Sequence, residues 1–393
     1  MADLQDELDS PAEAGENDDR RTAPTPTDDT FTDDTWAPAP ETAPEPEPEP
    51  EPLEPDLRDA LERARDLLTA HPVADGYSGL PSALWELPWY DLELGDSGLE
   101  TDLPRLRAGR VGMQFWSLQV PDGQPEGDRA VSSALEQLDL VRHVVGRYAN
   151  GLRVARDASE TTDARNCGRI ATLIGPASGR AIGDSLGALR QLHTLGLSSL
   201  TLSGTSWAGE GGLTPFGEEV VREMNRLGVL ADLSGSSPAT ARRVLAVSKA
   251  PVLWTRSGAR ALREHPANLD DEMLAAVGRM KGLCLVPFAA DRTGPALGDV
   301  ADHMEHVRRV AGADCVGISG MYDTRSAHPG ELTDASRYPR LVAELLRRGW
   351  PEADVAALTW GNVQRVLRGA DFTARAARER RGASTATIGR LDS

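Results

Sequence analysis

Imidazole and guanidinium groups are the side chains of this chain with the clearest capacity for chemistry. The seven histidines are His71, His143, His193, His265, His303, His306 and His328. His303 and His306 stand three residues apart, a spacing that places two rings on one helix face as a potential ligand pair. We expect that helix to lie away from the site with both rings on a solvated face. His265 falls in a loop after an apolar run, where functional residues are common.

Two arginines, Arg180 and Arg256, stand just after apolar runs. A guanidinium stays charged, offers no lone pair to a metal, and grips carboxylates or phosphates with paired hydrogen bonds. The hydroxyl clusters at 203–206 and 234–237 have no histidine or lysine base beside them in sequence. Turn and helix-cap roles are therefore expected for these serines and threonines.

Eight short apolar runs alternate with amphipathic stretches along the chain. The runs are 73–77, 110–118, 169–175, 198–204, 228–234, 250–256, 282–288 and 315–321. Most are apolar on both faces, as strands buried in a parallel sheet are. Helix starts between them are marked by Thr214-Pro215 and Ser237-Pro238. This alternation predicts an α/β fold, a (β/α)8 TIM-type barrel, with a doubly wound open sheet as the alternative.

The charge of the chain is concentrated at its N-terminal end. Residues 1–56 contain 19 Asp or Glu and only two Arg, whereas the remainder is nearly neutral. We predict a disordered acidic Pro/Glu-rich tail over 1–55, a barrel over 56–372, and a partly disordered Arg/Ala-rich C-terminal tail over 373–393. No clustered basic face is evident, so nucleic-acid binding is not expected. Neither a signal peptide nor a membrane-length apolar run is recognisable, and a cytoplasmic protein with free thiols is expected.

In a barrel of this kind the functional residues lie at the carboxyl ends of the strands. The segments there include DLPRLRAGRVGMQFWS at 102–117 and RLGVLADL at 226–233. Together with GISGMYD at 317–323, they resemble the membrane (renal) dipeptidase family of zinc metallopeptidases, from about Asp75 to Leu367. The resemblance implies a two-zinc barrel that cleaves dipeptides and is usually a homodimer.

The chain departs from the family pattern at the positions where the resemblance implies metal, substrate or proton-transfer groups. The degenerate positions are Tyr77, Gly79, Ala177, Gly204, Gly235, Arg256, Ala267 and Met321. Gly, Ala, Tyr and Met are not zinc ligands at such a centre. Asp323 survives near Met321, and Arg180, Arg256, His265 and Asp323 are the candidate pocket residues. We expect Arg256 to pair with Asp323 across the mouth.

These departures predict that no cofactor is bound, with zinc expected only for the family, and that the chain is a catalytically inactive homologue with a partner, regulatory or scaffold role. The expected partner is a second copy or a catalytic relative. One alternative is an active metallodipeptidase. A second is a module that binds a small peptide or anion at the barrel mouth, because function is decided by the site and not by the fold.

Overall fold

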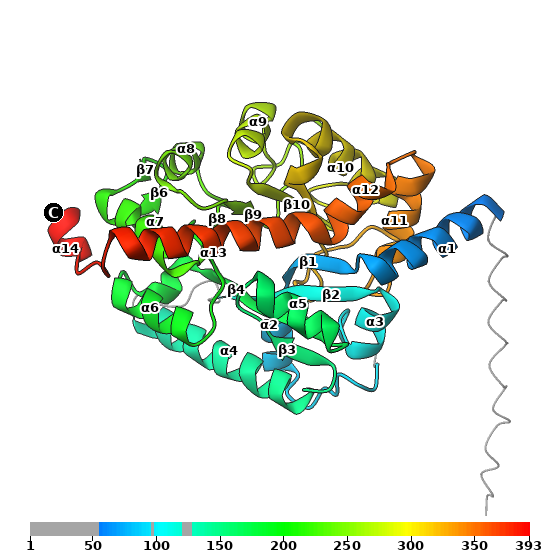
Figure 1. Ribbon diagram of the computed structural model, residues 1–393, viewed down its shortest axis with the longest axis horizontal. Coiled ribbons are helices and arrows are strands. Elements are labelled where there is room, and N and C mark those ends of the chain that lie inside the picture. Colours follow the sequence, from blue (N-terminus) through cyan, green and yellow to red (C-terminus); the bar gives the residue numbers. More distant parts are fainter. Residues whose placement is uncertain (1–54, 96–97, 120–127) are drawn as a thin grey trace, which may run out of the picture. The chain divides into compact units, whose positions relative to one another are not determined.

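The computed structural model describes residues 55–95, 98–119 and 128–393 (Figure 1). Its central sheet contains nine parallel strands in the order β2-β1-β11-β10-β9-β8-β5-β4-β3, and an additional β2–β4 pairing closes eight of them into a barrel. The barrel strands are β1 (Val73–Ser78), β2 (Val111–Leu118), β4 (Ile170–Ser178), β5 (Ser199–Thr201), β8 (Leu230–Asp232), β9 (Leu253–Trp254), β10 (Leu283–Pro287) and β11 (Val316–Ser319). All eight predicted strands and the predicted (β/α)8 barrel are confirmed.

The remaining strands are short additions to the barrel. β3 (Leu152–Val154) pairs with the outer edge of β4, and β6 (Ala208–Gly209) forms a small antiparallel pair with β7 (Gly212–Leu213). In the barrel register, Asp75 of β1 lies opposite Gln114 of β2 on one side and Ile318 of β11 on the other. The first and last strands are therefore neighbours, and their carboxyl ends meet.

Helices follow the strands and cover the barrel (Figure 1). They are α1 (Pro55–Ala70), α2 (Leu80–Glu86), α3 (Leu103–Ala108), α4 (Asp128–Arg147), α5 (Ala158–Asn166), α6 (Leu186–Thr194), α7 (Pro215–Leu227), α8 (Pro238–Val247), α9 (Asp271–Arg279), α10 (Leu297–Ala311), α11 (Tyr338–Arg347), α12 (Glu352–Ala356), α13 (Asn362–Arg380) and α14 (Ile388–Leu391). The predicted starts are confirmed: Thr214 accepts a hydrogen bond from the Gly217 amide at 3.1 Å, and Ser237 accepts one from Thr240 at 3.1 Å. Such caps satisfy amides that the first helical turn leaves free.

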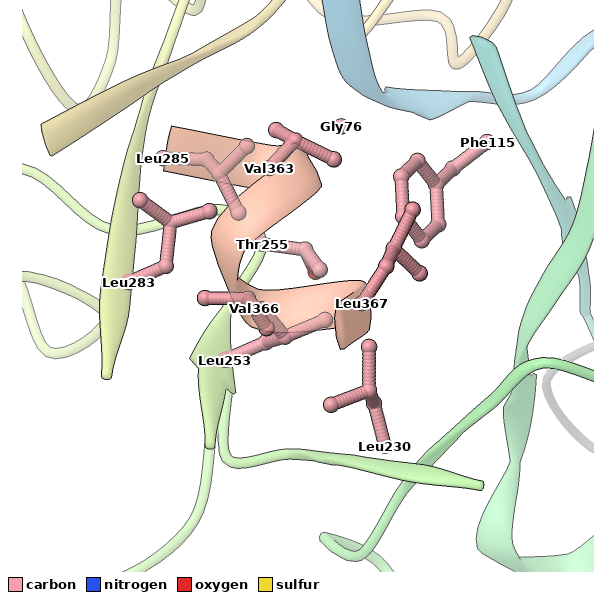
Figure 2. A pocket seen from close by; sticks show the side chains of 10 residues that line it. All are labelled: Gly76, Phe115, Leu230, Leu253, Thr255, Leu283, Leu285, Val363, Val366 and Leu367. Atoms are coloured by element: carbon pink, nitrogen blue, oxygen red, sulfur yellow. The ribbon is translucent and has the colours of Figure 1, made fainter. Parts of the chain in front are cut away.

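The amino-terminal end of the barrel is closed by apolar side chains (Figure 2). Val363, Val366 and Leu367 of α13 project toward Leu230, Leu253 and Leu283, which begin β8, β9 and β10. The space left among these side chains is about 10 Å³, the size of one water molecule. Because this end is plugged, the barrel opens only at the carboxyl ends of its strands.

The last residues of the chain pack on the barrel. Residues 373–380 continue α13 across the predicted boundary at residue 372, and Asp392 accepts hydrogen bonds from Thr214 Oγ1 (2.7 Å) and the Phe216 amide (2.8 Å). Asp392 thus takes up an amide at the start of α7. Partial disorder over 373–393 stays a prediction. The predicted N-terminal tail over 1–55 lies outside the described residues except for Pro55, which begins α1. In the described part of the chain, no helix combines the length and apolar character needed to cross a bilayer.

Candidate active site at the barrel mouth

The carboxyl ends of β1 and β11 are joined by an apolar contact. Tyr77, Ala289 and Met321 form a small buried cluster, and the Met321 amide donates to the Tyr77 carbonyl at 3.0 Å. Met321 holds a left-handed backbone conformation with φ of +52°. A bulky side chain in that conformation is strained, and such strain persists only where surrounding contacts enforce it. Two of the degenerate positions thus pack directly against each other.

Arg256, which follows β9, reaches across the mouth to the same tyrosine. Its guanidinium carbon lies 4.3 Å from the centre of the Tyr77 ring, and its Nη1 donates to the Tyr77 hydroxyl at 2.8 Å. Gln119 Nε2 donates to the same hydroxyl at 2.7 Å. A stacked guanidinium and a phenol are attracted electrostatically, the more so where water is partly excluded. The strand ends of β1 and β9 are therefore tied by a cation–π pair with its own hydrogen bond.

The carboxylate nearest to Arg256 is Asp232, at the end of β8. Its Oδ2 lies 3.6 Å from Arg256 Nη2, a distance too long for a hydrogen bond. The buried carboxylate instead accepts five hydrogen bonds: from the amides of Ser234 and Thr255, and from the hydroxyls of Thr201, Ser234 and Thr255. A carboxylate has about four lone-pair sites, so Asp232 has no acceptor capacity left for Arg256.

Gly79 marks a point of close backbone approach at the mouth. Its amide donates to the Tyr322 carbonyl at 2.8 Å, and a Cβ placed on Gly79 would lie 2.2 Å from the carbonyl oxygen of Asp323. Backbone atoms cannot yield as a flexible side chain can. Any larger residue at this position therefore requires the chain after β11 to move.

Asp323 does not pair with Arg256, and that expectation is wrong. Asp323 Oδ1 accepts from the Glu100 amide at 2.8 Å, and the Asp323 amide donates to Glu100 Oε2 at 2.6 Å. Reciprocal bonds to the segment before α3 hold the carboxyl on the β2 side of the mouth, away from β9. Its Oδ2 is buried without a hydrogen-bond partner among the described residues. Burial raises the pKa of Asp323 to about 7, and the nearby Glu100 charge adds to this effect.

His328 extends this acidic group. Its ring nitrogens contact Glu100 Oε2 at 3.1 Å and the Phe288 carbonyl at 2.5 Å. Burial works to lower the pKa of His328, but the hydrogen bond and charge of Glu100 outweigh it, and the pKa is raised. Asp323, Glu100 and His328 therefore lie together as a cluster in which Asp323 can hold a proton near neutral pH.

A cavity of about 1100 Å³ opens beside this cluster. The described residues that line it include Glu100 and Asp323 from the cluster, Gln119 and Gln137, and the half-exposed Trp85. Gln119 connects the cavity to the Arg256–Tyr77 pair through its bond to the Tyr77 hydroxyl. The mouth therefore contains the Arg256–Tyr77 cation–π pair and the cluster of Asp323, Glu100 and His328. Beside them lies a cavity with both polar and apolar walls.

The other predicted site residues have separate, mostly structural contacts. Ala177 is fully buried within β4, opposite Leu118 and Leu200. Arg180 Nε donates to the Gly204 carbonyl at 3.0 Å, which ties the loops after β4 and β5 together. Gly235 has a φ of +73°, a conformation that glycine adopts without strain.

His265 remains on the rim of the barrel mouth. Its Nδ1 accepts from the Ala267 amide at 3.1 Å, and its Nε2 lies 3.6 Å from Asp291 Oδ2. Burial, followed by the charge of Arg292, lowers its pKa. The His265 ring is therefore neutral at physiological pH, and it contacts Ala267 and Asp291 on the rim.

The expectation of a solvated face for His303 and His306 is wrong. Both side chains are buried on α10: His303 Nδ1 accepts from the Ala259 amide at 2.9 Å, and His306 Nε2 contacts Asp271 at 2.6 Å. Burial lowers the pKa of His303 to about 4. The two rings are oriented toward the loop after β9 and toward α9, so they serve packing and do not form a ligand pair.

Four residues that shape the mouth were not identified from the sequence: Glu100, Gln119, Asp232 and Arg292. Asp232 ends the predicted strand 228–234, and Gln119 follows the strand 110–118, so their positions at strand ends were the available signal. Glu100 and Arg292 lie in loops whose path the sequence pattern does not specify. Arg292 Nη1 donates to the Arg256 carbonyl at 2.9 Å, which places it on the same rim.

Comparison with known proteins shows extensive similarity to dipeptidases. Human dipeptidase 3 is 37% identical over 339 residues, which cover 80% of this chain and 68% of that protein. Dipeptidase verJ of Clonostachys rogersoniana is 35% identical over 343 residues, 79% of this chain and 87% of the relative. A crystal structure of a metallo peptidase from Rhodobacter sphaeroides, with a phosphinate mimic of L-Ala-D-Ala, superposes with a TM-score of 0.71. The two chains are 26% identical, and the superposition covers 76% of this chain and 99% of the Rhodobacter sphaeroides chain.

The prediction that no cofactor belongs to this protein is contradicted by these relatives, because solved structures at 26% identity are described as metallo peptidases. A metal is thus the cofactor of the proteins that this chain resembles. Within residues 55–95, 98–119 and 128–393, however, no group of three or more His, Cys, Asp or Glu is arranged to hold a metal ion. The side chains described at the strand ends do not fit a centre of that kind, so no chemical step is assigned to a metal here.

The match to the family extends well beyond individual motifs. Residues 61–381 match the family described as Membrane dipeptidase (Peptidase family M19), and this range includes every strand of the barrel and all of α13. The identity, the coverage and the barrel itself lead to one conclusion: the chain belongs to the membrane dipeptidase family.

Proposed function

We propose that this chain is a non-catalytic member of the dipeptidase family, with a partner, regulatory or scaffold role. The single observation that carries the proposal is the cation–π pair of Arg256 with Tyr77 at the centre of the mouth. The pair places a permanent positive charge and a phenol where the family resemblance implies metal ligands. A guanidinium and a phenol at these positions differ from the groups that the family resemblance implies there.

The backbone supports the same proposal. Gly79 abuts the Asp323 carbonyl, and Met321 packs on Tyr77 in a left-handed conformation. Restoring the chemistry of the family would therefore need coordinated changes at several strand ends and in the path of the chain after β11.

The direct test is hydrolysis of a panel of dipeptides by the purified full chain, with and without added zinc. The proposal predicts no hydrolysis above the uncatalysed rate in either condition. Turnover that increases with added zinc and disappears on chelation would exclude a non-catalytic role. The partner role is tested separately, by co-purification of the tagged chain with a catalytic relative from the same cells.

An active dipeptidase is the second candidate, and a specific observation favours it. Asp323, with a pKa raised to about 7 by burial, lies beside the cavity of about 1100 Å³ and is bonded to Glu100. A carboxyl that titrates near neutrality is suited to general acid or base catalysis. Hydrolysis that follows the ionisation of Asp323 and is lost in Asp323→Asn would support this candidate.

A further inference from the structure

The positive charge of Arg256 is only partly balanced by the protein. Among the described residues, its guanidinium makes one hydrogen bond, to the neutral phenol of Tyr77. The nearest carboxylate, Asp232, lies 3.6 Å away and has its oxygens occupied by five other donors. About a fifth of the Arg256 side chain (22%) remains exposed to solvent. Several of its N–H groups are thus available to a ligand in the mouth.

Arg292 brings a second guanidinium to the same rim. Its Nη1 is anchored on the Arg256 carbonyl at 2.9 Å, while its Nε is buried and makes no hydrogen bond within the described part of the chain. Asp291 Oδ2, 3.9 Å from that Nε, is too distant for one. A buried donor without an acceptor is costly, and natural structures usually satisfy it with a bound group or water.

The two guanidinium groups are electrostatically coupled. Burial lowers the pKa of Arg292, and the charge of Arg256 lowers it further. Each guanidinium has a carboxylate within 4 Å but no hydrogen bond to it: Asp232 lies 3.6 Å from Arg256, and the 61% exposed Asp291 lies 3.9 Å from Arg292. Two like charges, partly withdrawn from water and without a hydrogen-bonded carboxylate, favour an anion at this rim.

We propose that the guanidinium groups of Arg256 and Arg292 form a binding site for a small carboxylate or phosphate anion. Such an anion supplies the acceptors that both arginines lack and neutralises their mutual repulsion. Arginine favours these ligands because its planar fork matches two oxygens of the same group. This inference goes beyond the proposed function, since an anion can occupy the site whether or not a peptide bond is cleaved.

The test is calorimetric titration of the full chain at low ionic strength, where exposed charges are least screened. One arm uses inorganic phosphate and the other N-acetylglycine, so that the two sources of the anion are distinguished. The variants are Arg256→Gln and Arg292→Gln. The control is Arg63→Gln, which removes an exposed arginine on α1 that pairs with Glu352. Circular dichroism confirms that each variant is folded.

The expected result is binding of at least one anion by the wild-type chain. Each mouth variant should weaken that binding roughly ten- to a hundred-fold, as loss of a charge-assisted hydrogen bond does. Arg63→Gln should bind as the wild type does. The inference is overturned if the wild-type chain binds neither anion, or if both mouth variants bind as tightly as the control. If Arg256→Gln fails to fold, Arg292→Gln alone decides, because its only described side-chain hydrogen bond is to a backbone carbonyl. The hydrolysis assay is independent, so failure of this inference and failure of the proposed function are separately visible.

Discussion

Tyr77 and Arg256 each depart from the family pattern, and their side chains contact each other. We predict that the pair contributes a measurable coupling free energy. The variants Tyr77→Phe and Arg256→Gln, alone and together, form a double-mutant cycle for urea denaturation. A partly buried cation–π contact with a hydrogen bond should give a coupling of about 1–2 kcal/mol. Additive effects of the two substitutions would mean that the contact contributes no stability.

Asp323 makes a prediction about pH. Its pKa in the folded chain is raised to about 7 by burial, above the ordinary 3.8 of the unfolded chain. The folded state therefore holds the proton more tightly, and this group favours folding most below pH 4. That contribution is lost as the pH rises toward 7.

Asp323→Asn should remove this pH dependence. The variant is expected to gain roughly 2–4 kcal/mol of stability relative to the wild type between pH 4 and pH 7.5, from the size of the shift. Urea denaturation of both proteins at the two pH values measures the difference. A constant difference across the range would show that Asp323 titrates at its ordinary pKa.

The chain segments that follow β1 and β11 pack closely because Gly79 has no side chain. Gly79→Ala places a Cβ 2.2 Å from the Asp323 carbonyl oxygen, so the backbone must shift. We expect a loss of about 2 kcal/mol or more in thermal or urea unfolding. The matched control is Gly146→Ala in α4, where nothing lies within 4 Å of the added Cβ.

Gly146→Ala should be neutral or stabilising by up to about 1 kcal/mol, because alanine favours the helix. Equal effects of the two substitutions would contradict the close approach at Gly79. The contrast matters for function, since Gly79 is one of the positions where the family resemblance implies a metal, substrate or proton-transfer group.

The C-terminal segment gives a second prediction at this scale. Asp392 accepts from Thr214 Oγ1 and from the Phe216 amide, and so extends the cap of α7. Asp392→Ala should cost about 0.5–2 kcal/mol, the usual contribution of a capping side chain. Urea denaturation of the full chain measures it, and Asp392→Asn, which keeps an acceptor, should retain most of the stability. An alanine variant as stable as the wild type would show that the segment docks without supporting α7.

For the whole molecule, the sequence predicted the barrel well and the mouth less well. The eight strands were predictable because parallel strands buried on both faces have continuous apolar sequences. The starts of α7 and α8 were predictable because Thr214 and Ser237 are typical capping residues. The degenerate positions were identified through the resemblance to the dipeptidase family, which implies functional groups at those positions. The partner of Arg256 was predicted wrongly as Asp323, because the side chain turns toward Tyr77 while the loop after β11 holds Asp323 against Glu100.

The burial of His303 and His306 was missed for a related reason. Helical spacing shows that two residues share a face but does not show which neighbour covers that face. Here α10 is covered by the loop that follows β9 and also by α9. Arg292 shows the same limit, because its role depends on where a loop returns to the rim.

The hydrolysis rate of dipeptides by the full chain in the presence of zinc decides between a non-catalytic and a catalytic protein. The Rhodobacter sphaeroides metallo peptidase, which is 26% identical, serves as the reference under the same conditions. We expect the reference protein to hydrolyse dipeptides and this chain to hydrolyse none. Zinc-dependent turnover by this chain that is abolished in a separately purified Asp323→Asn variant would contradict it.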